Sequence, residues 1–213
     1  MSMGSLPAGV VLAGGRSRRM GEQVKALADL DGSPLIQHVI ARLRPQVSSL
    51  VLSVEQSTPA LDRFGLEQVE DLKPGNCGPL GGLLAALEKL PGGTDWLLLA
   101  PCDAPFVPLN LGQRLLGQAI ALATPGCIAR YAGELQPTFS LWHRSLAMRL
   151  RQCVCDDGMG GFKEFLAHLP LPSLDWEPGE VSPFFNVNMP ADLELAVKFL
   201  HGPDVDREIP RKE

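Results

Sequence analysis

The sequence predicts an α/β protein of three layers, in which helices cover both faces of one mostly parallel sheet. Apolar runs typical of strands alternate with segments whose apolar residues recur at helical spacing, along most of the chain. The run at residues 96–100 is apolar throughout, as expected of a central strand covered on both faces. The chain has 213 residues, 45% of them hydrophobic, which suffices for one domain that we expect to span residues 1–202.

The predicted strands are short and rich in aliphatic residues. They are expected at residues 10–13, 50–54, 67–70, 96–100, 127–131 and 135–141, with shorter extended pieces at 171–175 and 184–188. A turn at Gly133 separates the two strands on either side of it, and the strand at 67–70 leads directly into Asp71.

The predicted helices have clearer start signals than end signals. The first is expected to begin at Ser33-Pro34, because serine caps helices and proline fits their first turn, and to continue to Leu43. The others are expected at residues 78–90, 109–122, 145–155, 162–168 and 190–200. The tail at 203–213 is polar and contains proline, so we expect it to be disordered.

Composition excludes several classes of function. A net charge of −5 argues against nucleic acid as a partner, and no apolar run approaches the roughly 20 residues that a membrane span needs. The N-terminus lacks the features of a signal peptide. The five cysteines follow no disulfide framework, and Cys153 and Cys155 are too close together for a zinc knuckle, so we expect a cytoplasmic protein.

The first predicted strand ends on Gly14 and Gly15 and is followed by a basic segment. Glycines let a ligand approach the backbone and leave N–H groups free to bind an anion. This segment contains four basic residues and one acidic residue, namely Arg16, Arg18, Arg19 and Lys25, and Glu22. The spacing fits neither a P-loop nor the dinucleotide-binding fingerprint, so ATP hydrolysis and NAD chemistry are poor candidates. The segment predicts a phosphate site, the alternative being a glycine turn followed by a solvated basic loop.

Asp103 is the strongest candidate for a metal ligand. It follows the apolar strand at 96–100 directly and lies between Pro101 and Pro105. Ligands of α/β sheets bind beyond the carboxyl ends of the strands, and Mg²⁺ favours one or two protein carboxylates together with water and phosphate oxygens. The alternative is an aspartate that caps the following turn.

Other polar residues are predicted at the same edge. Ser53 and Asp71 end two strands, and a glycine-rich loop at 74–82 follows, which either lies against a ligand or needs positive φ. Asn186 and Asn188 precede a predicted helix and could either face a substrate or cap the helix. A polar turn at 136–138 is open to the same two interpretations.

Together and in this order, these motifs resemble the molybdenum cofactor guanylyltransferase family. The motifs that match are Leu12-Ala13-Gly14-Gly15, Arg19-Met20-Gly21 with Lys25, Asp71 before the loop at 74–82, Pro101-Cys102-Asp103 with Pro105, Pro137-Thr138, and Asn186-Val187-Asn188 with Pro190. The resemblance covers about residues 8 to 200. It implies a three-layer α/β/α nucleotidyltransferase with a mostly parallel, Rossmann-like sheet.

The resemblance also implies a reaction and a set of roles. GMP would be transferred from GTP to the phosphate of molybdopterin, and pyrophosphate would be released. Lys25 and Asp103 would be catalytic, and Asp103 would also ligate Mg²⁺. The residues implied to bind nucleotide, metal or pterin are Leu12, Ala13, Gly14, Gly15, Arg19, Lys25, Ser53, Asp71, Asp103, Asn186 and Asn188. Molybdoenzymes or other proteins of cofactor biosynthesis are the implied partners.

Three positions depart from the family pattern and keep alternatives open. Val24 replaces an acidic residue, and Ser53 and Glu55 stand in a strand that normally carries asparagine. A serine hydroxyl cannot reproduce the paired donor and acceptor of an amide. The alternatives are a cytidylyltransferase for the same cofactor, a more distant sugar-nucleotide pyrophosphorylase, and a paralogue that binds nucleotide or pterin without catalysis.

Overall fold

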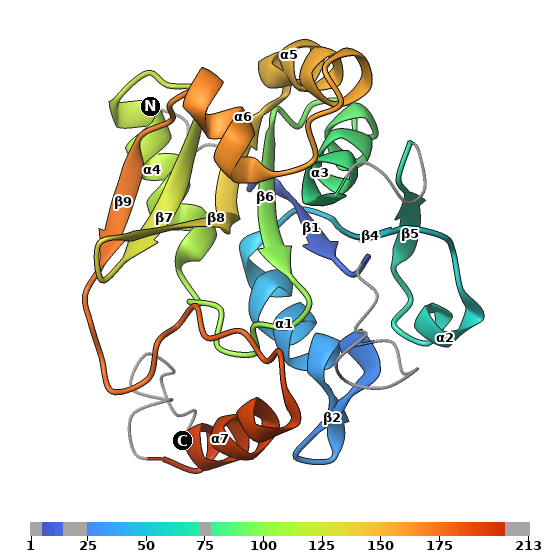
Figure 1. The fold of residues 1–213 in the computed structure, drawn as a ribbon, viewed down its shortest axis with the longest axis vertical. Helices are drawn as coiled ribbons and strands as arrows, with labels where there is room; N and C mark the ends of the chain where they lie inside the picture. The colour runs from blue at the N-terminus through green and yellow to red at the C-terminus, as the bar shows by residue number, and fades with distance from the viewer. Residues whose placement is uncertain (1–5, 15–24, 73–77, 203–213) are drawn as a thin grey trace.

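A seven-stranded sheet forms the centre of the computed structural model, which describes residues 6–14, 25–72 and 78–202. The strand order is β5-β4-β1-β6-β8-β7-β9, and only β8 runs against the others (Figure 1). The strands are β1 (Ala8–Leu12), β4 (Leu50–Val54), β5 (Glu67–Glu70), β6 (Trp96–Pro101), β7 (Gly126–Tyr131), β8 (Glu134–His143) and β9 (Ser173–Trp176). The prediction of a mostly parallel sheet is confirmed.

Helices connect the strands. They are α1 (Leu35–Leu43), α2 (Pro59–Asp62), α3 (Gly78–Glu88), α4 (Leu111–Ala121), α5 (Ala147–Arg151), α6 (Phe162–His168) and α7 (Pro190–Leu200). Short 3₁₀ turns lie at η1 (Lys25–Leu27), η2 (Arg44–Gln46) and η3 (Arg144–Leu146), and a π-helical turn, η4 (Gln152–Asp156), extends α5. The helix predicted at 145–155 is therefore present, but it changes from 3₁₀ through α to π geometry along its length.

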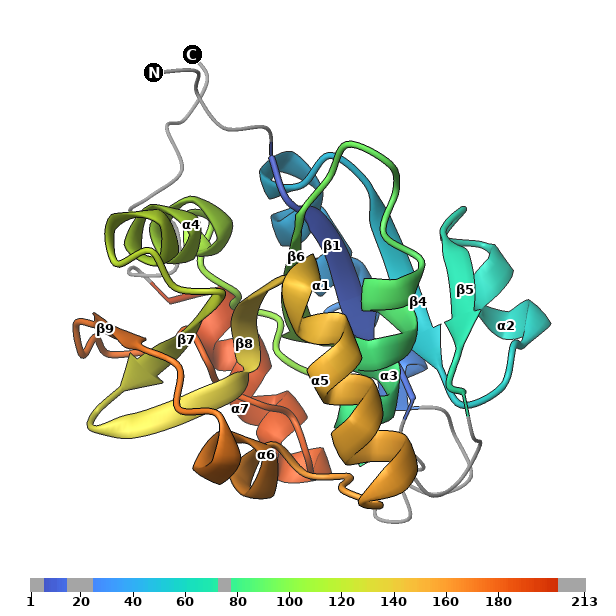
Figure 2. The same ribbon diagram turned by 90° about the horizontal axis from the view of Figure 1, so that it is seen from above.

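Alternate residues of each central strand face opposite layers of the protein. Val10, Leu97 and Leu99 pack in one apolar cluster with residues of α3, α5 and α6. Val11 and Leu98 pack in the other, with residues of α1 and α4. Side chains alternate across a sheet with a period of two, which explains the division. Figure 2 shows the strands in order with helices on both sides, so the three-layer prediction is confirmed.

The predicted start of the first helix was wrong by two residues. Ser33 and Pro34 form strand β3 (Ser33–Pro34) of a small antiparallel hairpin with β2 (Asp29–Leu30). The turn between them places both Asp31 and Gly32 at positive φ, the geometry that the Asp-Gly pair favours in two-residue hairpins. Helix α1 then begins at Leu35, whose N–H donates to the carbonyl of Ala28, 2.8 Å away.

The polar turn predicted at 136–138 lies instead within β8, as a bulge. Ile128 of β7 pairs with Ser140, but the next residue, Ala129, pairs with Gln136. The buried Ser140 holds the bulge, since its hydroxyl donates to the carbonyl of Pro137 at 2.6 Å and accepts from Trp142 Nε1 at 2.7 Å. The extended piece predicted at 184–188 is a loop and not a strand.

The loop and α7 extend the structure below the carboxyl ends of the parallel strands, next to the β2–β3 hairpin (Figure 1). A third apolar cluster joins these parts through five buried residues, Leu30, Leu35, Phe106, Val187 and Ala196. None of the described helices is long and apolar enough to cross a membrane.

Gln46, at the end of η2, fixes the loop that follows Asp103. Its buried side-chain amide donates to the carbonyls of Arg42 and Pro108, and its Oε1 accepts from Gly112 N–H, each at 2.8 Å. Every polar group of this amide is thus matched to a backbone group of α1, of the β6–α4 connection or of the first turn of α4. Buried backbone groups that lose such a partner are costly to leave unpaired.

Replacing Gln46 with Ala should lower the free energy of unfolding by about 2 to 4 kcal/mol, because two buried backbone groups lose their partner and a cavity remains. Urea denaturation would measure the loss. Gln113→Ala, at an exposed position of α4, is the matched control and should stay within about 0.5 kcal/mol of the parent. Equal effects of the two changes would contradict this role for Gln46.

Candidate functional site

Backbone pairing continues one residue past the ends of the central strands. Ala13 N–H donates to the carbonyl of Ser53 at 2.8 Å, and Cys102 N–H donates to the carbonyl of Leu12 at 3.0 Å. Asp71 N–H donates to the carbonyl of Val54 at 3.0 Å. Leu12 lies opposite Ser53 in β4 and opposite Pro101 in β6. The first segment after β1 is therefore held between the segments that present Ser53 and Asp103.

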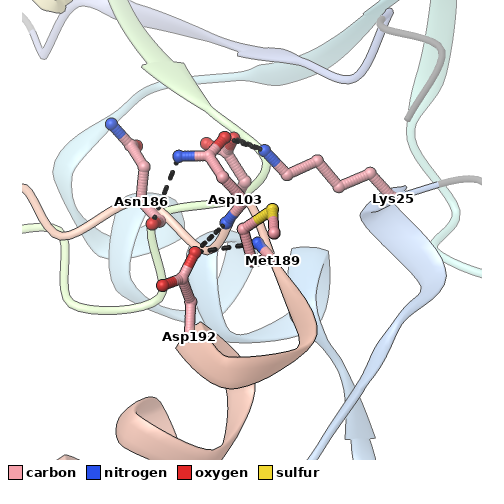
Figure 3. A network of polar contacts seen from close by, with 6 residues as sticks. Lys25, Asp103, Asn186, Met189 and Asp192 are labelled. Atoms are coloured by element: carbon pink, nitrogen blue, oxygen red, sulfur yellow. Dashed lines mark hydrogen bonds and ion pairs between the residues drawn. The ribbon is translucent and has the colours of Figure 1, made fainter. Parts of the chain in front are cut away.

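Lys25, Asp103 and Asn188 form one polar cluster although they are far apart in the sequence (Figure 3). The ammonium of Lys25 makes an ion pair with Asp103 Oδ2 and donates to Asn188 Oδ1 at 2.7 Å. The Lys25 and Asp103 side chains are only 16% and 17% exposed. The cluster thus joins η1, the end of β6 and the segment before α7.

Asp103 caps no turn among the described residues. Its Oδ2 is paired with Lys25, and its Oδ1 is buried without a hydrogen-bond partner in the part of the chain that the structure describes. Its main-chain carbonyl accepts from Val187 N–H at 2.8 Å, which ties β6 to the segment before α7. Of the two interpretations offered by the sequence, the arrangement favours a ligand-facing carboxylate. Burial raises the pKa of the adjacent Cys102 thiol to about 12, so a thiolate nucleophile is not available here.

Asn186 and Asn188 do not cap α7 either. The helix is capped from within, because one oxygen of Asp192 accepts from the N–H groups of Asn188 and Met189 at 2.7 and 2.8 Å. Asn188 Nδ2 donates to the carbonyl of Asn186 at 3.4 Å, and Asn186 Oδ1 is buried without a partner among the described residues. Neither amide side chain is used to cap the helix, and Asp192 fixes the backbone that presents them (Figure 3).

Sequence reasoning missed Asp192. The available signal was an acid at the third helical position after a proline start, which is typical of a capping box.

Ser53 and Asp71 form a second polar group at the same edge. The Ser53 hydroxyl donates to Asp71 Oδ1 at 3.4 Å. The pKa of Asp71 is raised to about 6, chiefly because the carboxyl is buried. The hydrogen bond from Ser53 lowers this pKa, and the negative charge of Glu55 raises it further. Helix α3 passes so close that a Cβ on Gly82 would lie 2.2 Å from Ser53 Oγ. Glycine at position 82 therefore leaves room for the Ser53 side chain.

The structure brings most of the predicted site residues to one edge of the sheet. Leu12, Ala13 and Gly14, at and just beyond the end of β1, lie between the Ser53–Asp71 pair and the cluster of Lys25, Asp103 and Asn188. A Cβ on Gly14 would lie 3.1 Å from the backbone nitrogen of Glu55, a tight approach that glycine accommodates without a shift of the neighbouring backbone. Gly15, Arg19, Val24 and the first part of the glycine loop at 74–82, namely residues 74–77, lie outside the described residues.

The donor set fits a magnesium ion held partly by its substrate. Among the residues described, no group of three or more His, Cys, Asp and Glu side chains could hold a metal ion. Asp103 offers a single carboxylate with one unpartnered oxygen at a sheet edge rich in polar groups. Mg²⁺ usually keeps several waters and binds one or two carboxylates together with substrate phosphates. Asp103 suits that mode of binding.

The raised pKa of Asp71 predicts a change in stability with pH. Because the folded protein disfavours the charged carboxylate, its stability should fall as pH rises from about 4 through about 6. Asp71→Asn should therefore stabilise the fold by about 1 kcal/mol above that window and have little effect below it, allowing for solvent screening of a half-buried group. Thermal unfolding of both proteins across this range would measure the difference.

The neighbouring Glu70 is the control with the opposite sign. Hydrogen bonds to its carboxylate from the Ser57 side chain and from Ser57 N–H, the latter at 2.9 Å, lower the pKa of Glu70. Glu70→Gln should therefore lose stability relative to the parent as pH rises. A pH-independent effect of Asp71→Asn would contradict the assignment of buried charge to Asp71.

Known proteins with a similar sequence agree on one family. Residues 9–172 match the profile of the family described as "MobA-like NTP transferase domain". A molybdenum cofactor guanylyltransferase of Mesorhizobium japonicum is 36% identical over 202 residues, covering 92% of this chain and 96% of the relative. The same enzyme of Yersinia pestis is 37% identical, covering 88% of this chain and 93% of the relative.

Solved structures show the same fold. Molybdopterin-guanine dinucleotide biosynthesis protein A of Archaeoglobus fulgidus is 25% identical with a TM-score of 0.75, covering 91% of this chain and 98% of that protein. A 2-C-methyl-D-erythritol 4-phosphate cytidylyltransferase of Thermus thermophilus is 16% identical with a TM-score of 0.69, covering 93% of this chain and 100% of that protein. This second similarity shows a shared fold alone. On the sequence match and these relatives, the chain belongs to the molybdenum cofactor guanylyltransferase family of MobA-like NTP transferases.

Proposed function

We propose that this protein transfers GMP from GTP to the phosphate of molybdopterin and so forms molybdopterin guanine dinucleotide. A phosphate oxygen of molybdopterin forms a bond to the α-phosphorus of GTP, the bond between the α- and β-phosphates breaks, and pyrophosphate leaves. The names of the relatives support the substrates. The observation that carries the proposal is the cluster of Lys25, Asp103 and Asn188 at the carboxyl ends of β1 and β6.

This reaction needs positioning and charge neutralisation more than a protein nucleophile. The backbone of Leu12, Ala13 and Gly14 approaches the nucleotide, with Gly15 and Arg19 supporting its phosphates. Lys25 supplies positive charge to the phosphates. Its largely buried ammonium, between Asp103 and Asn188, suits this role. A buried cation of this kind is worth more than an exposed one because little water screens it.

Asp71 and Ser53 bind the nucleoside end of GTP. The pKa of Asp71, raised to about 6, leaves its carboxylate largely ionised at neutral pH and therefore able to accept hydrogen bonds from ring N–H groups. The Ser53 hydroxyl, which already donates to Asp71, orients that carboxylate. The serine replaces the amide usual in the family, so Asp71 provides the larger part of base recognition here.

Asp103 would hold Mg²⁺, which, when bound, neutralises charge on the phosphate oxygens of GTP. Asn186 and Asn188 bind the pterin side, since both side chains are free of helix capping. The cytoplasm is the expected compartment, and molybdoenzymes or other cofactor-biosynthesis proteins are the expected recipients of the product.

The experiment is to mix the protein with molybdopterin, Mg²⁺ and either GTP or CTP, and to measure pyrophosphate and dinucleotide. Turnover with GTP alone is the expected result. Preference for CTP would overturn the choice of base in favour of a cytidylyltransferase. Binding of GTP without product would favour a non-catalytic paralogue, the alternative that Ser53 and Glu55 keep in view.

Asp103→Asn should reduce kcat by at least about a hundredfold, because the amide keeps the shape of the carboxylate but loses the charge that a cation needs. Asp95→Asn is the matched control. Asp95 precedes the other end of β6 and pairs with Arg144 at 3.1 Å on the exposed surface, so its loss should leave turnover unchanged. Circular dichroism would confirm that both variants fold. Normal turnover by Asp103→Asn would remove Asp103 from the metal role.

A further inference from the structure

We propose that the Lys25 ammonium is the cation paired with Asp103 before substrate binds. When nucleotide and divalent cation enter together, Lys25 leaves this carboxylate and pairs with the phosphates instead. The inference rests on the proposed function, which assigns the metal to Asp103 and the phosphates to Lys25. It adds an order of events to that function: the metal comes in with GTP and not before it.

Neither oxygen of Asp103 is open to a metal ion in this arrangement. Oδ2 is in contact with the Lys25 ammonium. Oδ1 is buried and has no hydrogen-bond partner among the described residues. A divalent ion can reach the carboxylate only after Lys25 moves, because two cations on one largely buried carboxylate repel each other.

The position of Lys25 is fixed by more than its attraction to Asp103. Asn188 Oδ1 accepts a second hydrogen bond from the ammonium at 2.7 Å, and Asp192 holds the backbone of Asn188. Asp103 is held in turn through its carbonyl by Val187 N–H. The ammonium therefore rests between two oxygens of the kind that Mg²⁺ and Mn²⁺ prefer, and it balances a buried negative charge that would otherwise be costly.

Leaving this position requires another anion for the lysine. The phosphates of GTP supply one, and the same phosphates supply the remaining oxygen ligands that a single carboxylate cannot provide. Lys25 and the metal thus depend on the same substrate, which couples their movements. Without nucleotide, the ion pair keeps the carboxylate closed to divalent cations.

The test measures binding of Mn²⁺ to the protein without nucleotide, by the enhancement of water-proton relaxation. Lys25→Met and Lys25→Gln each free Asp103 Oδ2 and Asn188 Oδ1, so both should bind Mn²⁺ about tenfold more tightly than the parent. Lys89→Met is the matched control, since Lys89 pairs with Glu67 at 3.6 Å on the exposed surface. It removes the same charge and should leave Mn²⁺ affinity at the parent value. Two variants at position 25 keep the test decisive if one of them folds poorly.

A second arm, with GTP present, tests the proposed metal site separately. The parent protein should then bind Mn²⁺ tightly, and Asp103→Asn should lose this binding. If Asp103→Asn keeps it, the metal assignment of the proposed function fails. If instead the Lys25 variants bind Mn²⁺ without nucleotide no more tightly than Lys89→Met, or the parent binds it equally with and without GTP, the exchange of Lys25 is overturned while the metal site stands.

Discussion

The central position of β1, hydrogen-bonded to β4 on one side and β6 on the other, is the constraint on which the site depends. Parallel pairing brings the carboxyl ends of these strands to one edge, and the pairing extends beyond them through Ala13 and Cys102. Polar residues that follow separate strands thereby become neighbours. No loop alone could bring Ser53 and Asp103 to opposite sides of one short segment.

The two aspartates at this edge have opposite electrostatic environments. Asp103 has a cation in contact with it, whereas among the described residues the Asp71 carboxylate accepts from a serine hydroxyl and lies near another acid, Glu55. An enzyme that binds a highly charged nucleotide can use both environments. The Asp103 carboxylate is paired with a cation, and the charge of the Asp71 carboxyl depends on pH near neutrality. Environments that separate the behaviour of two carboxyl groups are a common means of giving them separate tasks.

Much of this arrangement could be predicted from local sequence. The strands and the candidate carboxylate Asp103 follow from apolar runs that end in polar residues, whereas the role of Lys25 is implied by the family resemblance. The direct contact between Lys25 and Asp103 could not be predicted, because the chain path between residues 25 and 103 is set by packing of the whole sheet.

The errors have local physical causes. The hairpin before α1 depends on an Asp31-Gly32 turn that competes with the helix-start signal at Ser33-Pro34, and the turn prevails because Leu30 is buried against α7. The bulge in β8 depends on Ser140 and Trp142, whose bond forms only once both are buried. Such features follow from tertiary packing, which periodicity does not record.

The residues proposed to face the two substrates come from different stretches of the chain. Lys25, Ser53, Asp71 and Asp103 lie within the matched domain at 9–172, whereas Asn186 and Asn188 lie beyond it, on the segment before α7. Within the described residues, that segment is tied to Asp103 through Val187 and to Lys25 through Asn188. Donor and acceptor recognition are therefore separable in evolution: a lineage could acquire a new acceptor by changing its last few dozen residues while the nucleotide half of the enzyme stayed as it was.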